Sequence, residues 1–401
     1  MSFTFQLRHL GQRHLGQMMT RIASVSVCSV RVPLDRPTSF ATRTVTARDY
    51  CLAKIRSNDG VEGIGFCYVG SAGGEIARVI VEQLLAPMLI GQDSTRVEGL
   101  WEEMYREAIL QGRAGSVMRA ISILDIALWD LNARAVALPL YRYLGHWAKD
   151  RVPAYASGGY YLEGKTRKHL GEELSSYVRQ GFKAVKMKVG RLSPSEEEDR
   201  IRAARESIGS DVHLMLDANN AWSDLPTALL YCRRYQKYDP YWIEEPFSPD
   251  DIENHSRLAS LIDIPVATGE IEAGRWRFKE VLDKRAAIFL QTDAAVCGGI
   301  SEWRRIAQTA SSYGVTISPH WFHDLHVHLV ASAPNARYVE FFPDSQVLNF
   351  RNLINRQLEV KGGDLLLPTS PGLGFEFDEQ AVKKYCSNHS QPWIVVAGTN
   401  A

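Results

Sequence analysis

The stretch from Lys186 to Glu270 decides the fold, and it contains four polar motifs: Lys186-Met-Lys188, Asp217-Ala-Asn219, Glu244-Glu245-Pro246 and Gly269-Glu270. Their charged residues recur at steps of 29, 27 and 26 residues, counted from 188 to 217, 244 and 270. Each motif ends a short apolar run, and a segment with helical periodicity follows it. This rhythm is typical of a β/α barrel, whose functional residues gather at the carboxyl ends of the strands.

The same alternation extends on both sides of that stretch, and it predicts an α/β fold of the TIM-barrel type. We expect eight barrel strands, at residues 152–157, 184–189, 212–217, 241–245, 265–268, 287–292, 315–318 and 337–341. The residues between them have the spacing of helices, for example at 195–207, 223–238, 272–283 and 301–313.

The region before the barrel has a different pattern, which indicates an α+β domain. Strands are expected at residues 22–32, 50–57 and 62–68, with a polar loop at 33–47 and a hairpin turn at Asn58-Asp59-Gly60. Helical segments follow up to about residue 137. We therefore predict a loosely ordered tail at 1–19, where Arg-His-Leu-Gly-Gln occurs twice, a capping domain at 20–148, the barrel at 149–342, and a C-terminal segment at 343–401 that returns to the capping domain.

Composition excludes several classes of function. The 401 residues have a formal net charge of zero, which gives no sign of a nucleic-acid or membrane-surface binder. No apolar run approaches the roughly 18 residues of a membrane span. The six cysteines are scattered without a Cys-x-x-Cys pair, so we expect free thiols and a cytoplasmic protein.

Lys186 and Lys188 alternate on one face of their predicted strand, and Val185, Met187 and Val189 occupy the other. The apolar face suits packing against helices, so both lysines are expected to point into the barrel. Buried lysines are costly unless they are paired or functional. Two neighbouring ammonium groups also lower each other's pKa, which favours a role as a base.

Asp217, Glu244 and Glu270 each follow a strand, and any one of them alone is explained as a helix cap. Three in succession indicate ligands of a hard divalent cation such as Mg²⁺, which prefers oxygen donors. Asn219 shares the face of Asp217 and is a candidate substrate-binding residue. Glu245 points away from Glu244, which favours a supporting role.

Asp293 and His320 end the next two strands, 27 residues apart. A carboxylate beside a histidine fixes its tautomer and raises its basicity, so this pair is a candidate acid/base dyad facing the lysines. Glu340 lies near the end of the eighth strand. We call the predicted circle of polar residues at the strand ends the ring; its members are Lys186, Lys188, Asp217, Glu244, Glu270, Asp293, His320 and Glu340. Histidines at 323, 326 and 328 allow a second, zinc-type cluster, but a helix with its different faces exposed is the favoured interpretation. Gly298-Gly299 is a weak signal for an anion-binding helix start.

These residues in this order resemble the enolase superfamily, in particular its mandelate racemase subgroup. The similarity begins near residue 20, and it includes Trp242-Ile-Glu244-Glu245-Pro246, Cys297-Gly-Gly299 and Pro371-Gly-Leu-Gly374 in addition to the ring. It implies a modified (β/α)7β barrel with a capping domain, and Mg²⁺ held by Asp217, Glu244 and Glu270. It also implies a homo-oligomer.

The resemblance further implies proton abstraction next to a carboxylate, through an enediolate. Lys188 would be the base on one face, assisted by Lys186, and His320 with Asp293 would act from the other, while Glu340 would hydrogen-bond the carboxylate. The segments Asp59–Phe66 and Tyr155–Gly159 resemble the talarate/galactarate dehydratases.

The polar 33–47 segment, with Arg36 and the candidate substrate-binding residue Arg43, also suits an acid sugar. We therefore predict a Mg²⁺-dependent dehydratase of aldonates or aldarates. A racemase or epimerase on the same site is the alternative. A zinc hydrolase built on His326 and His328, and a barrel kept only for binding, are further alternatives.

Overall fold

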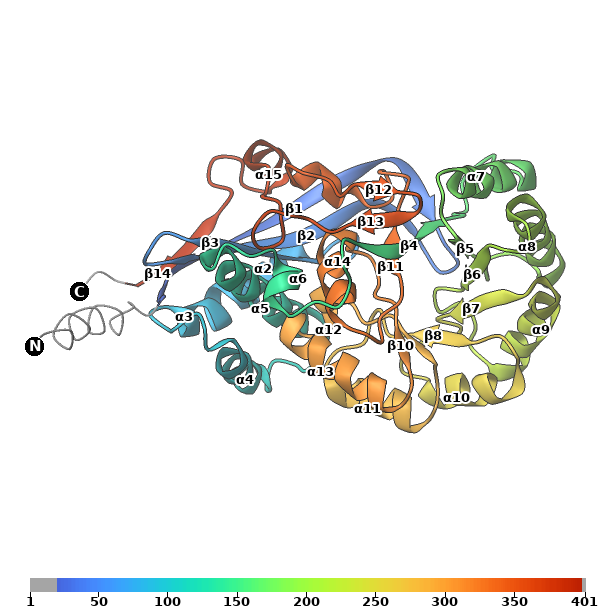
Figure 1. Cartoon of the computed structure of the whole chain (residues 1–401), viewed down its shortest axis with the longest axis horizontal. Helices are drawn as coiled ribbons and strands as arrows, with labels where there is room; N and C mark the ends of the chain where they lie inside the picture. The colour runs from blue at the N-terminus through green and yellow to red at the C-terminus, as the bar shows by residue number, and fades with distance from the viewer. Residues whose placement is uncertain (1–19, 399–401) are drawn as a thin grey trace, which may run out of the picture.

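A four-stranded antiparallel sheet forms one end of the molecule in the computed structural model, which describes residues 20–398. Its order is β14 (Ile394–Ala397), β1 (Ile22–Ser39), β2 (Thr44–Ser57) and β3 (Glu62–Tyr68) (Figure 1). The predicted hairpin is present, and its Gly60 has a φ of 89°. The predicted tail at 1–19 lies outside the described residues.

Helices pack against one face of this sheet and against one another. Together with β1 to β3 they form what we call the capping layer. They are α2 (Gly74–Ile80), the π-helix η1 (Val81–Leu85), α3 (Ala86–Leu89), α4 (Val97–Ala108), α5 (Gly115–Ala135) and α6 (Leu140–Tyr143). The long, mostly buried α5 lies directly on β3. A Cβ atom on Gly65 would stand 1.9 Å from the backbone oxygen of Ile123, so only glycine permits this close approach.

A parallel barrel forms the other end of the molecule, and it confirms the predicted fold class. Its strands are β4 (Arg151–Gly158), β5 (Ala184–Lys188), β6 (His213–Asp217), β7 (Pro240–Glu244), β8 (Val266–Thr268), β9 (Phe289–Leu290), β10 (Thr316–Ile317) and β11 (Val339–Phe341). β11 pairs in parallel with β4, and a parallel bridge between Ile317 of β10 and Ala336 completes the circle. The helices between the strands are α7 (Arg167–Arg179), α8 (Pro194–Ile208), α9 (Leu225–Tyr235), α10 (Ile252–Leu261), α11 (Arg275–Asp283), α12 (Ala294–Cys297), α13 (Gly299–Ser312) and α14 (His323–Ser332).

The interior of the barrel is a packed aromatic and aliphatic cluster. It consists of side chains from successive strands, namely Tyr155, Ala184, Met215, Trp242, Ala267, Phe289 and Tyr338. Because strand residues alternate between faces, the next inward positions on β5 to β7 lie one layer above this cluster. These positions carry Lys186 and Glu244, so the polar ring has a solid apolar floor.

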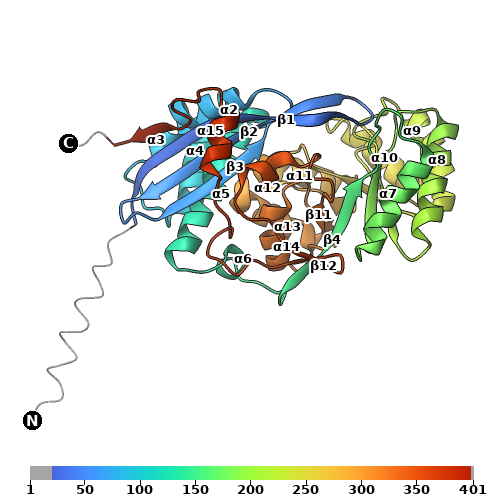
Figure 2. The ribbon, with the colours of Figure 1, turned by 90° about the horizontal axis from the view of Figure 1, so that it is seen from above.

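The predicted polar loop at residues 33–47 is wrong. β1 continues to Ser39 and β2 begins at Thr44, so the two strands form a ribbon that turns at residues 40–43. Prolines at 33 and 37 made these residues resemble a loop; their effect is an interruption of the strand pairing between Pro33 and Thr38. The ribbon reaches over the barrel (Figure 2), where Thr42 Oγ1 donates to the backbone oxygen of Asn219 over 3.2 Å.

The C-terminal residues contact both parts of the molecule. β12 (Val360–Lys361) and β13 (Asp364–Leu366) extend the barrel sheet next to β4, whereas β14 pairs with β1. α15 (Glu379–Tyr385) lies between them in sequence. Because these strands pair with both parts of the molecule, contacts alone do not set the limits of the predicted domains, which stay a prediction. All six cysteines are buried and free, as expected. No helix within residues 20–398 has the length and apolar character to cross a membrane.

Candidate active site

The strand register aligns the predicted residues across the mouth of the barrel. Lys188 on β5 is paired with Asp217 on β6, and Asp217 is paired with Glu244 on β7. Glu270 follows β8 after one turn of chain. Parallel strands in register bring their carboxyl ends together, which explains why residues 27 and 26 positions apart in the chain become neighbours.

Three carboxylates form the centre of the site. One oxygen from each of Asp217, Glu244 and Glu270 lies within 4.8 Å of the other two, and this is the group with metal-ligand geometry found within the described residues. Asp217 and Glu244 are fully buried. Burial and the nearby Asp217 raise the pKa of Glu244 well above its usual value, so an added cation would relieve strong repulsion.

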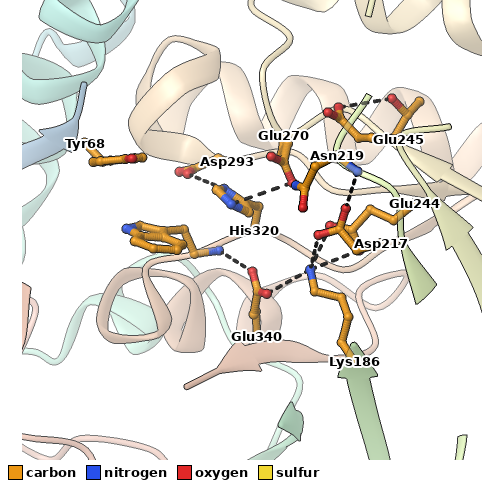
Figure 3. A network of polar contacts seen from close by, with 12 residues as sticks. Tyr68, Lys186, Asp217, Asn219, Glu244, Glu245, Glu270, Asp293, His320 and Glu340 are labelled. Carbon is orange, nitrogen blue, oxygen red and sulfur yellow. Dashed lines mark hydrogen bonds and ion pairs between the residues drawn. The ribbon is translucent and has the colours of Figure 1, made fainter. Parts of the chain in front are cut away.

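Both lysines are buried, and Figure 3 shows Lys186 among these carboxylates. Lys186 Nζ donates to Glu244 Oε1 over 2.7 Å and lies 2.8 Å from Glu340 Oε1. Lys188 Nζ donates to Asp217 Oδ2 over 2.5 Å. The lysines therefore contact the same oxygens that are the candidate metal ligands.

The expected lowering of the lysine pKa values is wrong for this arrangement. Burial acts to lower the pKa of Lys188, but the adjacent Asp217 outweighs it and the pKa is raised. The pKa of Lys186 is also raised, because Glu244 and Glu340 outweigh its burial. The sequence pattern revealed the neighbouring like charge but not the closer opposite charges.

His320 and Asp293 lie together, on the other side of the carboxylates from β5. Nδ1 of His320 is 3.2 Å from Asp293 Oδ2, and its Nε2 is 3.7 Å from Glu270 Oε2. This leaves Nε2 directed to the centre of the site (Figure 3). Burial would lower the pKa of His320, but Glu270 and Asp293 outweigh it and the pKa is raised.

Glu340 connects the two sides of the ring. Its Oε1 contacts Lys186, and its Oε2 accepts a hydrogen bond of 2.9 Å from the backbone nitrogen of Trp321. Lys186 and His320 outweigh burial and lower the pKa of Glu340 to about 2. The carboxylate is thus held ionised and oriented before any ligand arrives.

The turns that follow these strands are strained. Asn219, Asn220, Glu245 and Trp321 all have positive φ values, between 43° and 74°. Residues other than glycine rarely adopt this backbone conformation. Its energetic cost is tolerated mainly at functional sites. Asn219 places its backbone nitrogen 2.9 Å from Asp217 Oδ1, while its side-chain oxygen is buried without a partner in the described structure.

Two family models together cover most of the chain. The mandelate racemase / muconate lactonizing enzyme N-terminal domain matches residues 22–145, and the enolase C-terminal domain-like model matches residues 169–381. The chain belongs to the mandelate racemase / muconate lactonizing enzyme family of the enolase superfamily.

Relatives within this family are acid-sugar enzymes. The chain is 34% identical to arabinonate dehydratase of Saccharolobus solfataricus, over 83% of this chain and 89% of that one. It is also 34% identical to L-talarate/galactarate dehydratase of Salmonella typhimurium, over 90% of each chain. L-talarate dehydratase from Polaromonas sp. JS666, solved with Mg and L-glucarate, aligns with a TM-score of 0.84 at 33% identity over 94% and 99% of the two chains.

Among the described residues, the predicted substrate-binding residue Arg43 makes no hydrogen bond or ion pair with the groups of the site; its side chain contacts Phe40. It lies at the turn of the ribbon, where its side chain is exposed and packs over Phe40, with 5.5 Å from the guanidinium carbon to the ring centre. Arg36 is also exposed and forms an ion pair with Asp344. Phe40 itself reaches the site, because Lys188 Nζ lies 5.8 Å from its ring centre.

The histidines after His320 are on α14, as expected, but the prediction that different faces are exposed is wrong. His323, His326 and His328 are all buried. His326 Nε2 accepts a hydrogen bond from the backbone nitrogen of Ala294, and His328 joins α6 to the C-terminal segment. His323 Nε2 lies 3.3 Å from Asp324 Oδ2. The described residues hold no histidine metal cluster.

Two further sequence signals are supporting contacts. The helix start at Gly298-Gly299 does receive an acidic side chain, that of Asp125 on α5, which accepts from the backbone nitrogen of Ser301 over 2.9 Å. Glu245 is buried and accepts from Asn220 Nδ2 over 2.7 Å.

Sequence reasoning missed three residues near the ring: Arg48, Tyr68 and Trp242. Trp242 Nε1 donates to Glu244 Oε2 over 3.1 Å, and its place two residues before Glu244 was a usable signal. Arg48 and Tyr68 come from β2 and β3, and no spacing in the sequence links them to the barrel.

Proposed function

We propose that this protein is a Mg²⁺-dependent acid-sugar dehydratase that converts an aldonate or aldarate to a 2-keto-3-deoxy acid. The observation that carries the proposal is the order of groups around the barrel mouth. Lysines on β5 and the His320–Asp293 pair after β9 and β10 flank three carboxylates from β6, β7 and β8. A base and an acid on opposite sides of one cation site suit removal of a proton and of a hydroxyl from adjacent carbons.

The donor set fits Mg²⁺. All three groups are carboxylates, without a sulfur or nitrogen ligand that would favour zinc. One oxygen from each carboxylate lies within 4.8 Å of the other two, so the three groups would hold one Mg²⁺ together. Mg²⁺ held by Asp217, Glu244 and Glu270 would withdraw charge from the substrate carboxylate and stabilise the enediolate.

The remaining steps belong to side chains of this protein. Lys188, in its neutral form, would take the proton from the carbon next to the carboxylate, because a cation held by Asp217 would withdraw the charge that raises the pKa of this lysine. Lys186 would bind the substrate carboxylate, Glu340 would orient Lys186 through their contact, and Asn219 would contact a hydroxyl. His320 would give its proton to the hydroxyl on the next carbon, which leaves as water. The resulting enol then becomes the keto acid. The raised pKa of His320 supports this part, because it keeps a proton available for donation.

The direct test is product formation from a panel of aldonates and aldarates, with the 2-keto acid trapped as its semicarbazone. We expect turnover of at least one acid sugar with Mg²⁺ and loss of turnover after chelation. Thermal melting with and without Mg²⁺ is a second readout, because a cation that binds only the folded state raises the melting temperature. Absence of product from every sugar, with Mg²⁺ bound, would contradict the proposal.

Oligomeric state and location complete the proposal. We expect a homo-oligomer, and exposed apolar side chains support it: Ile109, Leu110 and Trp276 are 45%, 94% and 49% exposed. Light scattering of the purified chain checks this. The free cysteines support a reducing, cytoplasmic location, which fractionation of the source cells would test.

A further inference from the structure

Arg48 on β2 is a buried cation without an acidic partner. Its side chain lies in the sheet face that looks toward the barrel, and the residue is 2% exposed. Nη1 donates to Tyr68 Oη over 3.1 Å, while Nε is buried and bonded to nothing. Within residues 20–398, no Asp or Glu oxygen lies within 4.0 Å of the guanidinium. The edge formed by Nε and Nη2 is the edge that binds a carboxylate with two parallel hydrogen bonds.

The contacts that Arg48 does make do not offset its burial. The guanidinium carbon lies 4.5 Å from the centre of the Trp321 ring and 5.4 Å from that of Tyr68. Such cation–π contacts recover only part of what is lost when an ion is removed from water. An anionic ligand is the group that would complete this environment.

Arg200 shows that this lack of an acid is not general. Arg48 and Arg200 are the arginines that count as buried in the described part of the chain. Arg200 Nη1 bonds Glu197 over 2.8 Å and the backbone oxygen of Lys188 over 2.9 Å, and its Nη2 bonds the backbone oxygen of Gly159. The barrel therefore supplies its buried arginine with an acid, and the capping layer does not.

Arg48 lies within reach of the reacting groups. The Trp321 ring stacks on His320 with 5.5 Å between centres, and Arg48 lies 4.5 Å from the same ring, so the guanidinium is at most about 10 Å from the imidazole. Tyr68, which accepts a hydrogen bond from Arg48, stacks on the same Trp321 ring with 5.2 Å between centres. An extended six-carbon chain spans about 6 Å between its end carbons, at about 1.5 Å per bond. A hydrogen bond adds about 2.9 Å.

We propose that Arg48 binds a carboxylate at the far end of the substrate, which makes aldarates, acid sugars with a carboxylate at both ends, the substrate class of this protein. Tyr68 and Trp321 are positioning residues that hold the guanidinium. The inference rests on the proposed dehydratase function and narrows its substrate.

Pairs of sugars that differ only at C6 test this proposal without any mutation. Galactarate and galactonate form one such pair, and glucarate and gluconate another. We expect kcat/KM of the unaltered protein to favour the diacid about 100-fold or more, because the monoacid leaves Arg48 unpaired. Equal values for the two members of a pair, or a preference for the monoacid, would overturn the proposal.

Arg48→Gln removes the charge and keeps much of the volume. We expect it to lower kcat/KM for the diacid about 100-fold or more, mainly through KM, and to change the monoacid value less than about threefold. Arg36→Gln is the matched control, since Arg36 lies on the same ribbon and already pairs with Asp344; it should leave both values unchanged. Equal losses for both sugars in Arg48→Gln would indicate a structural role and overturn the proposal.

Calorimetric binding to Lys188→Ala separates this proposal from the dehydratase proposal, because it needs no turnover. We expect the diacid to bind Lys188→Ala with Mg²⁺ and to bind the Lys188→Ala/Arg48→Gln double variant about 100-fold more weakly. Diacid binding that depends on Arg48, without keto-acid formation by the unaltered protein, would refute the reaction and retain the ligand. Equal diacid binding by both variants would refute the role of Arg48.

Discussion

The ring at the strand ends differs in its charge pairing from the cluster of Arg48, Tyr68 and Trp321, which we call the wall. In the ring, Lys186 and Lys188 both contact carboxylates, and His320 contacts Asp293. In the wall, Arg48 is buried against aromatic rings without an acid. In the ring, the carboxylates outnumber the cationic side chains that contact them, which suits an added metal ion. The wall is already arranged and has no counter-charge.

This difference separates the two tasks of the site. Groups that carry out chemistry are placed by the barrel itself, through strand register and the β/α repeat. The group that we assign to substrate choice is placed by packing between Arg48, Tyr68 and Trp321, which belong to three segments. Substitutions in the ring should therefore change kcat for every substrate, whereas substitutions in the wall should change the preference among substrates.

The largest expected effect comes from the ring. Lys188→Ala removes the proposed base, and we expect kcat to fall about 1000-fold or more for diacids and monoacids alike. Lys183→Ala is the control, since this lysine is exposed at the start of the same strand segment. Keto-acid assays and circular dichroism would check the result. Retained turnover in folded Lys188→Ala would refute the proposed role.

A smaller effect tests the support beneath the ring. Trp242→Phe removes the hydrogen bond from Nε1 to Glu244 Oε2, so we expect Mg²⁺ to bind about 10 to 100 times more weakly. Titration calorimetry measures the affinity. Trp101→Phe is the matched control, because this buried Nε1 donates to the backbone oxygen of Gly298 instead of a carboxylate. Unchanged Mg²⁺ affinity in Trp242→Phe would show that Trp242 does not position Glu244.

A comparable substitution in the wall should act only on substrate preference. Tyr68→Phe removes the hydroxyl that accepts from Arg48 Nη1, and we expect kcat/KM for the diacid to fall about tenfold. The monoacid value and the Mg²⁺ affinity should stay the same. An equal loss of kcat/KM for the diacid and the monoacid would show that Tyr68 serves the reaction itself and would contradict the division of tasks between ring and wall.

The smallest effect concerns His328, which connects the barrel helix α14 to α6 of the capping layer. His328 accepts from the backbone nitrogen of Tyr141 through Nδ1 and donates to the backbone oxygen of Leu373 through Nε2. Burial lowers the pKa of His328 from 6.5 to about 4, so between these values the unfolded chain takes up a proton that the folded one does not. Stability is therefore lost as pH falls through this window, by up to about 3 kcal/mol from this group.

His328→Gln should remove that pH-dependent part. In urea unfolding, we expect the free-energy difference between the unaltered protein and His328→Gln to shrink from pH 7 to pH 5. A constant difference across this range would show that the imidazole does not remain neutral in the fold.

The parts of the molecule that repeat locally were predictable from sequence. Apolar runs followed by charged residues at near-constant spacing gave the barrel strands and placed Asp217, Glu244 and Glu270 together, because parallel strands in register leave little freedom. The lysine pKa values were not predictable, since they depend on the distances to Asp217 and Glu244. The ribbon at 33–47 was missed because its prolines and polar residues suit a paired but solvated strand as well as a loop. Arg48 was missed because its burial comes from Trp321, far along the chain.

Proton NMR of the protein with Mg²⁺ and galactarate or glucarate in D₂O is the most direct test of the central claim. The account predicts loss of the proton next to one carboxylate and growth of a 3-deoxy methylene signal, as water leaves the adjacent carbon. Exchange of that proton without a methylene signal would contradict dehydration and assign the same ring to a racemase or epimerase.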